Sequence, residues 1–246
     1  MVEGMADECI HGFEAGLCDI CYPRVQREAP KPVRVQKATA ARPATAPPPA
    51  PFSLSTLRLF HVTHLRNLEQ ILTDGELRAD ATPAVDVSSA TTRELRAAAD
   101  LADGTTVAQH VAFYASPTAE RWLEQRDGAH GPHWSDAARD AKATEFVFLA
   151  VPATKLGDDI TAADADAAAP ATRFAHGVTD ASTLLRRAKA ADPDLQAPEI
   201  LAGSTVAFDE VALIGVANEP IRDQVRDLLA AADYDTRVAV YPPWFQ

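Results

Sequence analysis

Apolar residues recur along residues 57–246 with the periods of short strands and amphipathic helices. Residues 57–62 (LRLFHV) are predicted to form a strand, and the segment 64–77 is predicted to be a helix whose apolar residues 65, 68, 71 and 72 share one face. Thr63 is expected to cap the start of this helix and Gly75 its end. The sequence thus predicts a strand that leads directly into a helix.

Five later segments extend this picture. Residues 145–151 (EFVFLAV) are apolar on both faces, which favours a central strand. The others are a strand at 110–116, two strands or one bent strand at 205–218, a helix at 219–232 with a proline in its first turn, and a half-buried strand at 236–243. Since strands and helices mix without strict alternation, we predict an α+β fold rather than a doubly wound sheet.

Composition divides the chain into three parts. Residues 24–52 are rich in Ala and Pro and carry six Lys or Arg but one acid, which indicates an extended linker. Residues 1–23 hold five acids and no Lys or Arg. We therefore expect a small head at 1–23, a basic linker at 24–52 and one catalytic-sized domain at 53–246.

The head contains all three cysteines of the chain, and an odd number is poorly explained by disulfides. Its candidate metal ligands are Cys9, His11, Cys18 and Cys21, and thiolates with imidazole are the ligands that Zn²⁺ prefers. Four ligands without an open position predict a structural zinc knuckle. The alternative is a disordered acidic tail with incidental reduced cysteines.

Charge and hydropathy limit the class of protein. The net charge of −12 argues against broad attachment to a nucleic-acid backbone, although a locally basic groove remains compatible with it. No run of 18 apolar residues occurs, and the acidic start differs from a signal peptide. We expect a cytoplasmic protein with no membrane association.

Four blocks in the domain, taken in order, resemble a known family. They are FHVTHLRNLEQILTDGEL (60–77), VSSATTRELR with VAFYASP (87–117), EFVFLAV with TAADADAAAPATRF (145–174), and APEILAGSTVAFDEV (197–211). Over roughly residues 57–216 their order and spacing are similar to those of the DarT toxins, NAD-dependent ADP-ribosyltransferases that modify bases of single-stranded DNA. The resemblance implies an ADP-ribosyltransferase-like, mainly antiparallel sheet with flanking helices.

The resemblance also implies the catalytic residues. Glu199 matches the family's catalytic glutamate, although a lone Glu beside a Pro at a strand start would ordinarily be a solvated acid. Arg93 is the candidate for the active-site arginine. Arg96, three residues later, is the alternative and a candidate NAD ligand, since both can face the same way on a helix.

The remaining NAD-site candidates lie on the two strands. His61 and Thr63 alternate along the first strand and so share a face, which the resemblance makes part of the NAD site. Phe113 and Tyr114 face opposite sides of theirs, so one is expected to stack on nicotinamide while the other joins the core. His64 is expected to be a structural neighbour at the start of the helix.

Two departures from the family pattern bear on the acceptor. The segment that often carries Asn in the family reads ADADAAA here, with Asp164 and Asp166, and an acid there removes an amide donor. The AFYASP stretch also lacks the family's common proline before its aromatic pair. Both departures concern the acceptor more than the type of reaction.

By this resemblance the protein is expected to transfer ADP-ribose from NAD to a base of single-stranded DNA, most readily thymine, as the toxin of a toxin–antitoxin system. Its partners are then single-stranded DNA and a macrodomain antitoxin similar to DarG. Two alternatives remain. The first keeps the chemistry but uses guanine, RNA or protein as acceptor, and the second is a non-catalytic module that binds NAD or nucleic acid.

Overall fold

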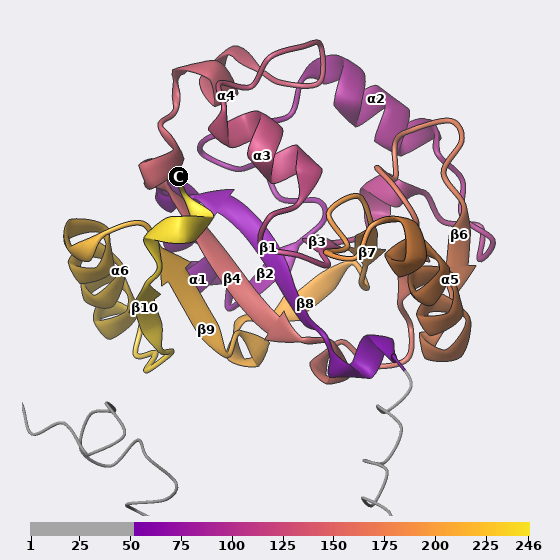
Figure 1. Ribbon diagram of the computed structural model, residues 1–246. Coiled ribbons are helices and arrows are strands. Elements are labelled where there is room, and N and C mark those ends of the chain that lie inside the picture. Colours follow the sequence, from indigo (N-terminus) through magenta and orange to yellow (C-terminus); the bar gives the residue numbers. More distant parts are fainter. Residues whose placement is uncertain (1–51) are drawn as a thin grey trace, which may run out of the picture. The chain divides into compact units, whose positions relative to one another are not determined.

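The computed structural model describes residues 52–246, in which an eight-stranded sheet runs through the centre of the domain. Its strands are ordered β10-β9-β4-β1-β3-β7-β5-β6, and every neighbouring pair is antiparallel except β10 with β9 (Figure 1). The predicted α+β fold with a mainly antiparallel sheet is confirmed. The strands of this sheet are β1 (Arg58–His64), β3 (Ala112–Tyr114), β4 (Phe146–Pro152), β5 (Thr161–Ala163), β6 (Phe174–His176), β7 (Glu199–Leu201), β9 (Leu213–Val216) and β10 (Val238–Val240).

The two longest strands form the middle of this sheet. β4 pairs with β1 along all seven residues of each strand, and β9 covers its other edge. Six consecutive residues of β4, Phe146 to Val151, are buried, as expected for a strand that is covered on both faces. The prediction of a central strand at 145–151 is confirmed.

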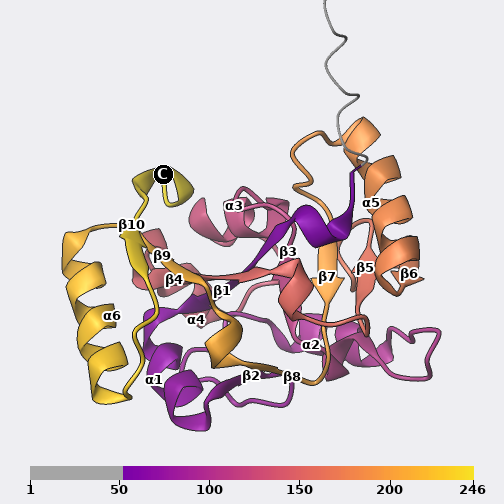
Figure 2. The same ribbon diagram turned by 90° about the horizontal axis from the view of Figure 1, so that it is seen from below.

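The segment 205–218, predicted to form two strands or one bent strand, consists of two strands that belong to different sheets. β8 (Thr205–Ala207) pairs with β2 (Glu76–Arg78) in a separate two-stranded ribbon, and a helical turn at Phe208–Glu210 then leads into β9. The ribbon lies beside α1 on one side of the main sheet (Figure 2).

Helices cover both faces and both ends of the main sheet. α5 lies beside β5 and β6, while α6 lies beside β9 and β10 at the opposite end (Figures 1 and 2). The helices are α1 (Leu65–Asp74), α2 (Ala90–Ala98), α3 (Glu120–Arg126), α4 (Asp136–Asp140), α5 (Val178–Ala191) and α6 (Glu219–Ala231). No helix among residues 52–246 is long and apolar enough to cross a membrane.

The start of α1 differs from the prediction, whereas its end agrees with it. His64, not Thr63, is the N-cap, and its Nδ1 accepts a hydrogen bond of 3.1 Å from the backbone N–H of Arg66. Thr63 still belongs to β1, because the strand continues to His64. Gly75 ends the helix at a φ of +71°, a conformation that glycine adopts without strain.

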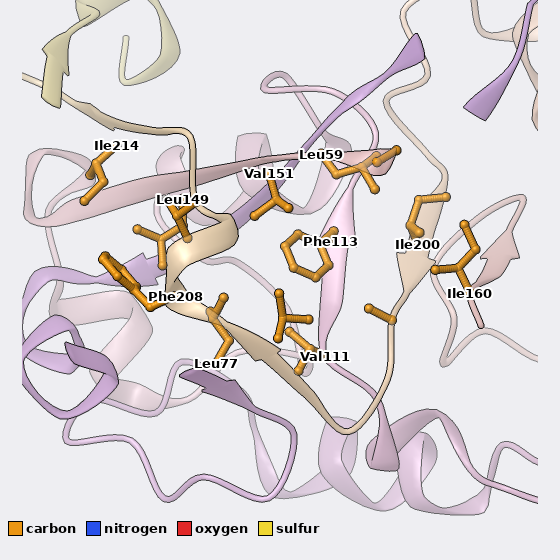
Figure 3. Packing of buried hydrophobic residues seen from close by; sticks show 14 of the residues in the cluster. Leu59, Leu77, Val111, Phe113, Leu149, Val151, Ile160, Ile200, Phe208 and Ile214 are labelled. Carbon is orange, nitrogen blue, oxygen red and sulfur yellow. The ribbon is translucent and has the colours of Figure 1, made fainter. Parts of the chain in front are cut away.

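Two apolar clusters pack on opposite faces of the sheet. The larger cluster includes Leu59, Phe113, Leu149 and Ile200, whose side chains converge beneath the strands (Figure 3). The smaller cluster is aromatic: Trp122 of α3 meets Phe146 and Phe148 of β4 edge to face. Because each strand residue points towards one cluster or the other, the two clusters distinguish the two faces of the sheet for the side chains described below.

Candidate active site

The central sheet opens between β1 and β3. These strands share a single residue pair, Phe60 with Tyr114, although β1 pairs with β4 along its whole length. Beyond that pair, the Nδ1 atom of His61 donates to the carbonyl oxygen of Ala112 at 3.0 Å, so a side chain replaces the missing backbone ladder. A cavity of about 590 Å³ lies at this opening, which is within the range of small-molecule sites.

Glu199 lies in this cavity with a cationic partner. It begins β7, is only 4% exposed, and its Oε2 accepts a hydrogen bond of 3.0 Å from Nη1 of Arg96 on α2. Burial lowers the pKa of Arg96, but the charge and hydrogen bond of Glu199 outweigh that effect and raise the pKa above its usual value. The glutamate is therefore a buried carboxylate in an ion pair, not a solvated acid.

Tyr114 lies directly across from Glu199 in the register of β3 and β7, so their side chains are neighbours on one face. Burial raises the pKa of the Tyr114 hydroxyl, and the negative charge of Glu199 raises it further. Tyr114 is thus a neutral hydrogen-bond donor next to the carboxylate.

Arg93 and Arg96 both line the cavity, but they have different partners. Arg93 pairs with Asp86 and donates to the carbonyl of Ser88 at 2.7 Å, and its side chain is 54% exposed. The side chain of Arg96 is 20% exposed and contacts Glu199. The structure therefore brings Arg96 to the glutamate and leaves Arg93 at the rim.

His61 and Thr63 also line the cavity, on the other face of the sheet. Because Nδ1 of His61 donates to a carbonyl, its Nε2 carries a lone pair that can accept a hydrogen bond. Burial lowers the pKa of His61, only partly offset by that carbonyl, so the ring is neutral at pH 7. The hydroxyl of Thr63 accepts from Asn67 at 3.1 Å and retains its own hydrogen for donation.

The aromatic pair of β3 is divided as its alternation predicts. Phe113 is 1% exposed, belongs to the larger core cluster and meets His61 edge to face at 5.9 Å. Tyr114 lines the cavity on the opposite face. Of the two aromatic residues, only Tyr114 can therefore contact a ligand directly.

Asn67 lines the cavity and holds one of its segments in place, a role that the sequence analysis did not predict. Its amide forms two bonds with the backbone of Val85, donating to the carbonyl at 2.9 Å and accepting from the N–H at 2.8 Å. This clamp fixes residues 79–88, many of which line the cavity, to α1. The available signal was a polar residue four positions before Ile71, beside the apolar face of the helix.

A second ion pair, also missed, lies in the same cavity. Arg121 of α3 pairs with Asp166 from the segment between β5 and β6, and the two side chains are 17% and 21% exposed. Burial lowers the pKa of Arg121, but Asp166 and Glu124 raise it above its usual value. This pair and Arg96–Glu199 are thus the two guanidinium–carboxylate pairs of the cavity in which both side chains are less than a quarter exposed, unlike the exposed Arg93–Asp86 pair.

The expected zinc ligands Cys9, His11, Cys18 and Cys21 lie outside the described residues. Within residues 52–246, no group of three or more His, Cys, Asp or Glu side chains is arranged to hold a metal ion.

The structure combines a split, mainly antiparallel α+β sheet with a Glu–Arg ion pair inside a cavity, and such convergent polar groups in a cavity are typical of an enzyme active site. A family model described as "ssDNA thymidine ADP-ribosyltransferase, DarT" matches residues 60–246. The chain belongs to this family. No match was found among curated proteins.

Solved structures share the fold. DarT from Thermus sp. 2.9 in complex with ADP-ribosylated ssDNA superimposes with a TM-score of 0.66 at 18% identity, over 78% of this chain and 97% of that one. The same protein in complex with NAD+ gives a TM-score of 0.63 at 18% identity, over 78% and 98%. Thermosipho africanus DarTG in complex with ADP-ribose gives 0.60 at 18% identity, over 77% of this chain and 51% of that one.

Proposed function

We propose that the protein transfers ADP-ribose from NAD to thymine in single-stranded DNA, as the toxin of a toxin–antitoxin system. The observation that carries the proposal is the buried Arg96–Glu199 pair, at 3.0 Å, in the cavity of a chain that belongs to the DarT family. The Thermus relative binds NAD+ in one structure and ADP-ribosylated ssDNA in another, which supports the same two ligands here.

NAD is held along the opening of the sheet. The lone pair on Nε2 of His61 accepts a hydrogen bond from a ribose hydroxyl or from the nicotinamide amide, and the hydroxyl of Thr63 donates one. Tyr114 supplies an aromatic ring and a neutral hydroxyl beside the reacting sugar. These contacts orient the nicotinamide ribose towards Glu199 and exclude water from it.

Bond breaking and bond making both occur beside Glu199. The bond between nicotinamide and ribose C1′ breaks through a transition state with positive charge on the sugar ring, which the carboxylate stabilises. The base nitrogen attacks C1′, its N–H proton passes to Glu199, and neutral nicotinamide leaves. Arg96 holds the carboxylate in place and offers its remaining N–H groups to the pyrophosphate or to the deprotonated base.

The proposal assigns to Arg96 the role for which the sequence pattern favoured Arg93. Arg93 is occupied by Asp86 and by the Ser88 carbonyl. It is better suited to shape the rim, where these two contacts hold the segment 86–88 against α2.

The test is direct transfer. The full chain is incubated with NAD and thymidine-containing oligonucleotides, and the DNA should gain the mass of one ADP-ribose, whereas Glu199→Gln should give no product. Oligonucleotides without thymine, RNA and protein serve as parallel acceptors in the same experiment. Transfer to one of these but not to thymidine would refute the acceptor, and no transfer to any DNA by the wild type would refute the function.

Two further proposals concern the rest of the system. We propose that residues 1–23 form a structural zinc knuckle through Cys9, His11, Cys18 and Cys21, ahead of the 24–52 linker and the 53–246 domain. Chelation should release about one zinc per chain, and a metal-free protein after native purification would contradict the proposal.

The second proposal concerns the antitoxin. We propose that a macrodomain partner similar to DarG removes the modification. Its co-expression should then restore the growth of cells that express the wild type, whereas cells that express Glu199→Gln should need no rescue. Growth inhibition that persists in the presence of such a partner would contradict this assignment.

A further inference from the structure

The second ion pair of the cavity, Arg121 with Asp166, has no role in the chemistry proposed above. Arg121 is fixed from three sides: Asp166 binds its Nη2, Glu124 accepts from its Nη1 at 3.0 Å, and its guanidinium lies 5.8 Å from the centre of the Trp134 ring. These partners come from three separate segments of the chain. Such a preorganised guanidinium suits the recognition of an oxyanion.

Asp166 is fixed as firmly as its partner. Its Oδ1 accepts from the N–H of Ala168 at 2.9 Å, and its backbone carbonyl accepts from the hydroxyl of Thr172 at 2.6 Å. The carboxylate therefore cannot swing away from Arg121 without breaking the turn that carries it. Removing its charge while keeping its shape is a clean perturbation.

The pair lies on the Glu199 face of the sheet. α3 packs through Trp122 against Phe148, and Phe148 packs against Phe60, whose neighbour across the strands is Tyr114. His61 instead packs against Phe113 in the cluster on the opposite face. Two ligands must meet at Glu199, and if NAD reaches it from the His61 side, the Arg121 side is left to the acceptor.

Unpaired polar atoms also indicate a polar ligand on this side. Within the described part of the chain, Nε2 of Gln125, Nδ1 of His133 and Nε1 of Trp134 are buried without a hydrogen-bond partner, and all three residues line the cavity. Gln125 is 6% and Trp134 8% exposed. Buried nitrogens of this kind are ordinarily satisfied in a protein by a ligand or a water molecule.

We infer that Arg121 binds a backbone phosphate of the acceptor strand next to the modified nucleotide, and that Asp166 is a positioning residue that competes with the phosphate for Arg121. The inference rests on the proposed function. Two carboxylates, those of Asp166 and Glu124, face one guanidinium, so the resting site offers a phosphate no net positive charge. Asp166 thereby weakens strand binding and favours release of the modified DNA.

The central variant is D166N. Asparagine keeps the oxygen that accepts from Ala168 and loses only the negative charge, so the turn survives while Arg121 keeps Glu124 as its remaining carboxylate partner. D164N is the matched control: Asp164 lies in the same segment, pairs with the exposed Arg173, and does not line the cavity. R126Q serves the same purpose for R121Q, because Arg126 belongs to the same helix but pairs with Asp127 away from the cavity.

Binding is measured by fluorescence anisotropy with a labelled thymidine oligonucleotide, in an E199Q background so that no turnover occurs. We expect D166N to lower the Kd about three- to tenfold and R121Q to raise it by about tenfold. For R121Q, the slope of the logarithm of the binding constant against the logarithm of the salt concentration should be shallower by about 0.7, as expected for one lost phosphate contact. D166N should have no effect when combined with R121Q, because the two residues act through one contact. The controls should leave the Kd unchanged.

Kinetics in the wild-type background separate the two sources of phosphate. The KM for NAD should stay within about twofold for D166N, while the KM for the oligonucleotide falls. A shift in the KM for NAD instead would show that Arg121 serves the NAD pyrophosphate, and a D166N chain that binds DNA as D164N does would reduce the pair to a structural role. Either result overturns the inference.

D166N is sufficient for this test if R121Q does not fold. Failure of the proposed function is a separate outcome, because it would appear as a wild-type chain that transfers no ADP-ribose to DNA.

Discussion

Replacing each of the two neighbouring arginines of α2 by glutamine distinguishes their roles most sharply. R96Q removes the charge that faces Glu199, whereas R93Q removes an exposed partner of Asp86. The substitution is the same, and the two sites are three residues apart on one helix. Any difference between the variants therefore reflects environment, not helix propensity.

The expected difference in stability follows from burial. At 3.0 Å and an effective dielectric constant of about 20, the Arg96–Glu199 attraction is on the order of 5 kcal/mol, much of which offsets the desolvation of both groups. R96Q leaves a carboxylate that is 4% exposed without its cation, which should lower the free energy of unfolding by about 3–5 kcal/mol. Arg93 and Asp86 are 54% and 39% exposed, so R93Q should cost less than about 1 kcal/mol.

Urea denaturation followed by circular dichroism gives both free energies, and ADP-ribose transfer to a thymidine oligonucleotide gives the activities. R96Q should also reduce kcat/KM by at least about 100-fold, because the carboxylate loses its fixed position and the transition state loses a nearby cation. R93Q should stay within about tenfold, through weaker binding at the rim. Equal losses of stability and activity in the two variants, or a larger loss in R93Q, would refute the reasoning.

Three further predictions follow from single contacts. Asn67→Ala leaves the backbone N–H and C=O of Val85 without their side-chain partner, so it should lower the free energy of unfolding measured in urea by about 1–3 kcal/mol. It should also raise the KM for NAD, because Val85 belongs to a segment that lines the cavity. Burial lowers the pKa of His61 below its usual 6.5, so the unfolded chain takes up the proton first as the pH falls. The stabilisation by the neutral ring should be complete above about pH 6.5 and decrease at lower pH. His61→Gln should therefore make the free energy of unfolding in urea depend less on pH over this range. Gly215→Ala would bring a methyl group to 2.4 Å from the Trp244 ring and should lower the midpoint of thermal unfolding by several degrees, unlike Gly203→Ala, whose nearest contact is 3.7 Å.

The sequence predicts the centre of the fold well because its pattern of apolar residues indicates which strand residues are buried. The six-residue apolar run of β4 requires cover on both faces, and the alternation of β1 identifies which side chains share a face. Three-residue strands such as β5, β6 and β7 carry no comparable signal, because three residues are too few to establish a period. The order of the sheet, and with it the position of Glu199 opposite Tyr114, depends on long-range pairing that local pattern does not encode.

The cavity shows the same limit at the level of single side chains. Glu199 was identified by its block of sequence, but its burial and its partner come from tertiary contacts. Arg121 and Asp166 are 45 residues apart, and neither belongs to a pattern that predicts the other. Asn67 alone carried a local signal, as a polar residue beside the apolar face of α1.

The choice between Arg93 and Arg96 depends on which side of α2 faces Glu199, and the sequence does not predict this orientation. An amphipathic helix reveals its phase through its apolar face, but none of the residues of α2 is fully buried. Its orientation is set from outside, by the Ser89 cap and by the hydroxyl of Thr92, which donates to the carbonyl of His133 at 2.9 Å. That anchorage directs Arg93 back towards the preceding loop and, three residues on, brings Arg96 to Glu199. The geometry of the proposed catalytic pair therefore depends on a contact with a loop 41 residues away.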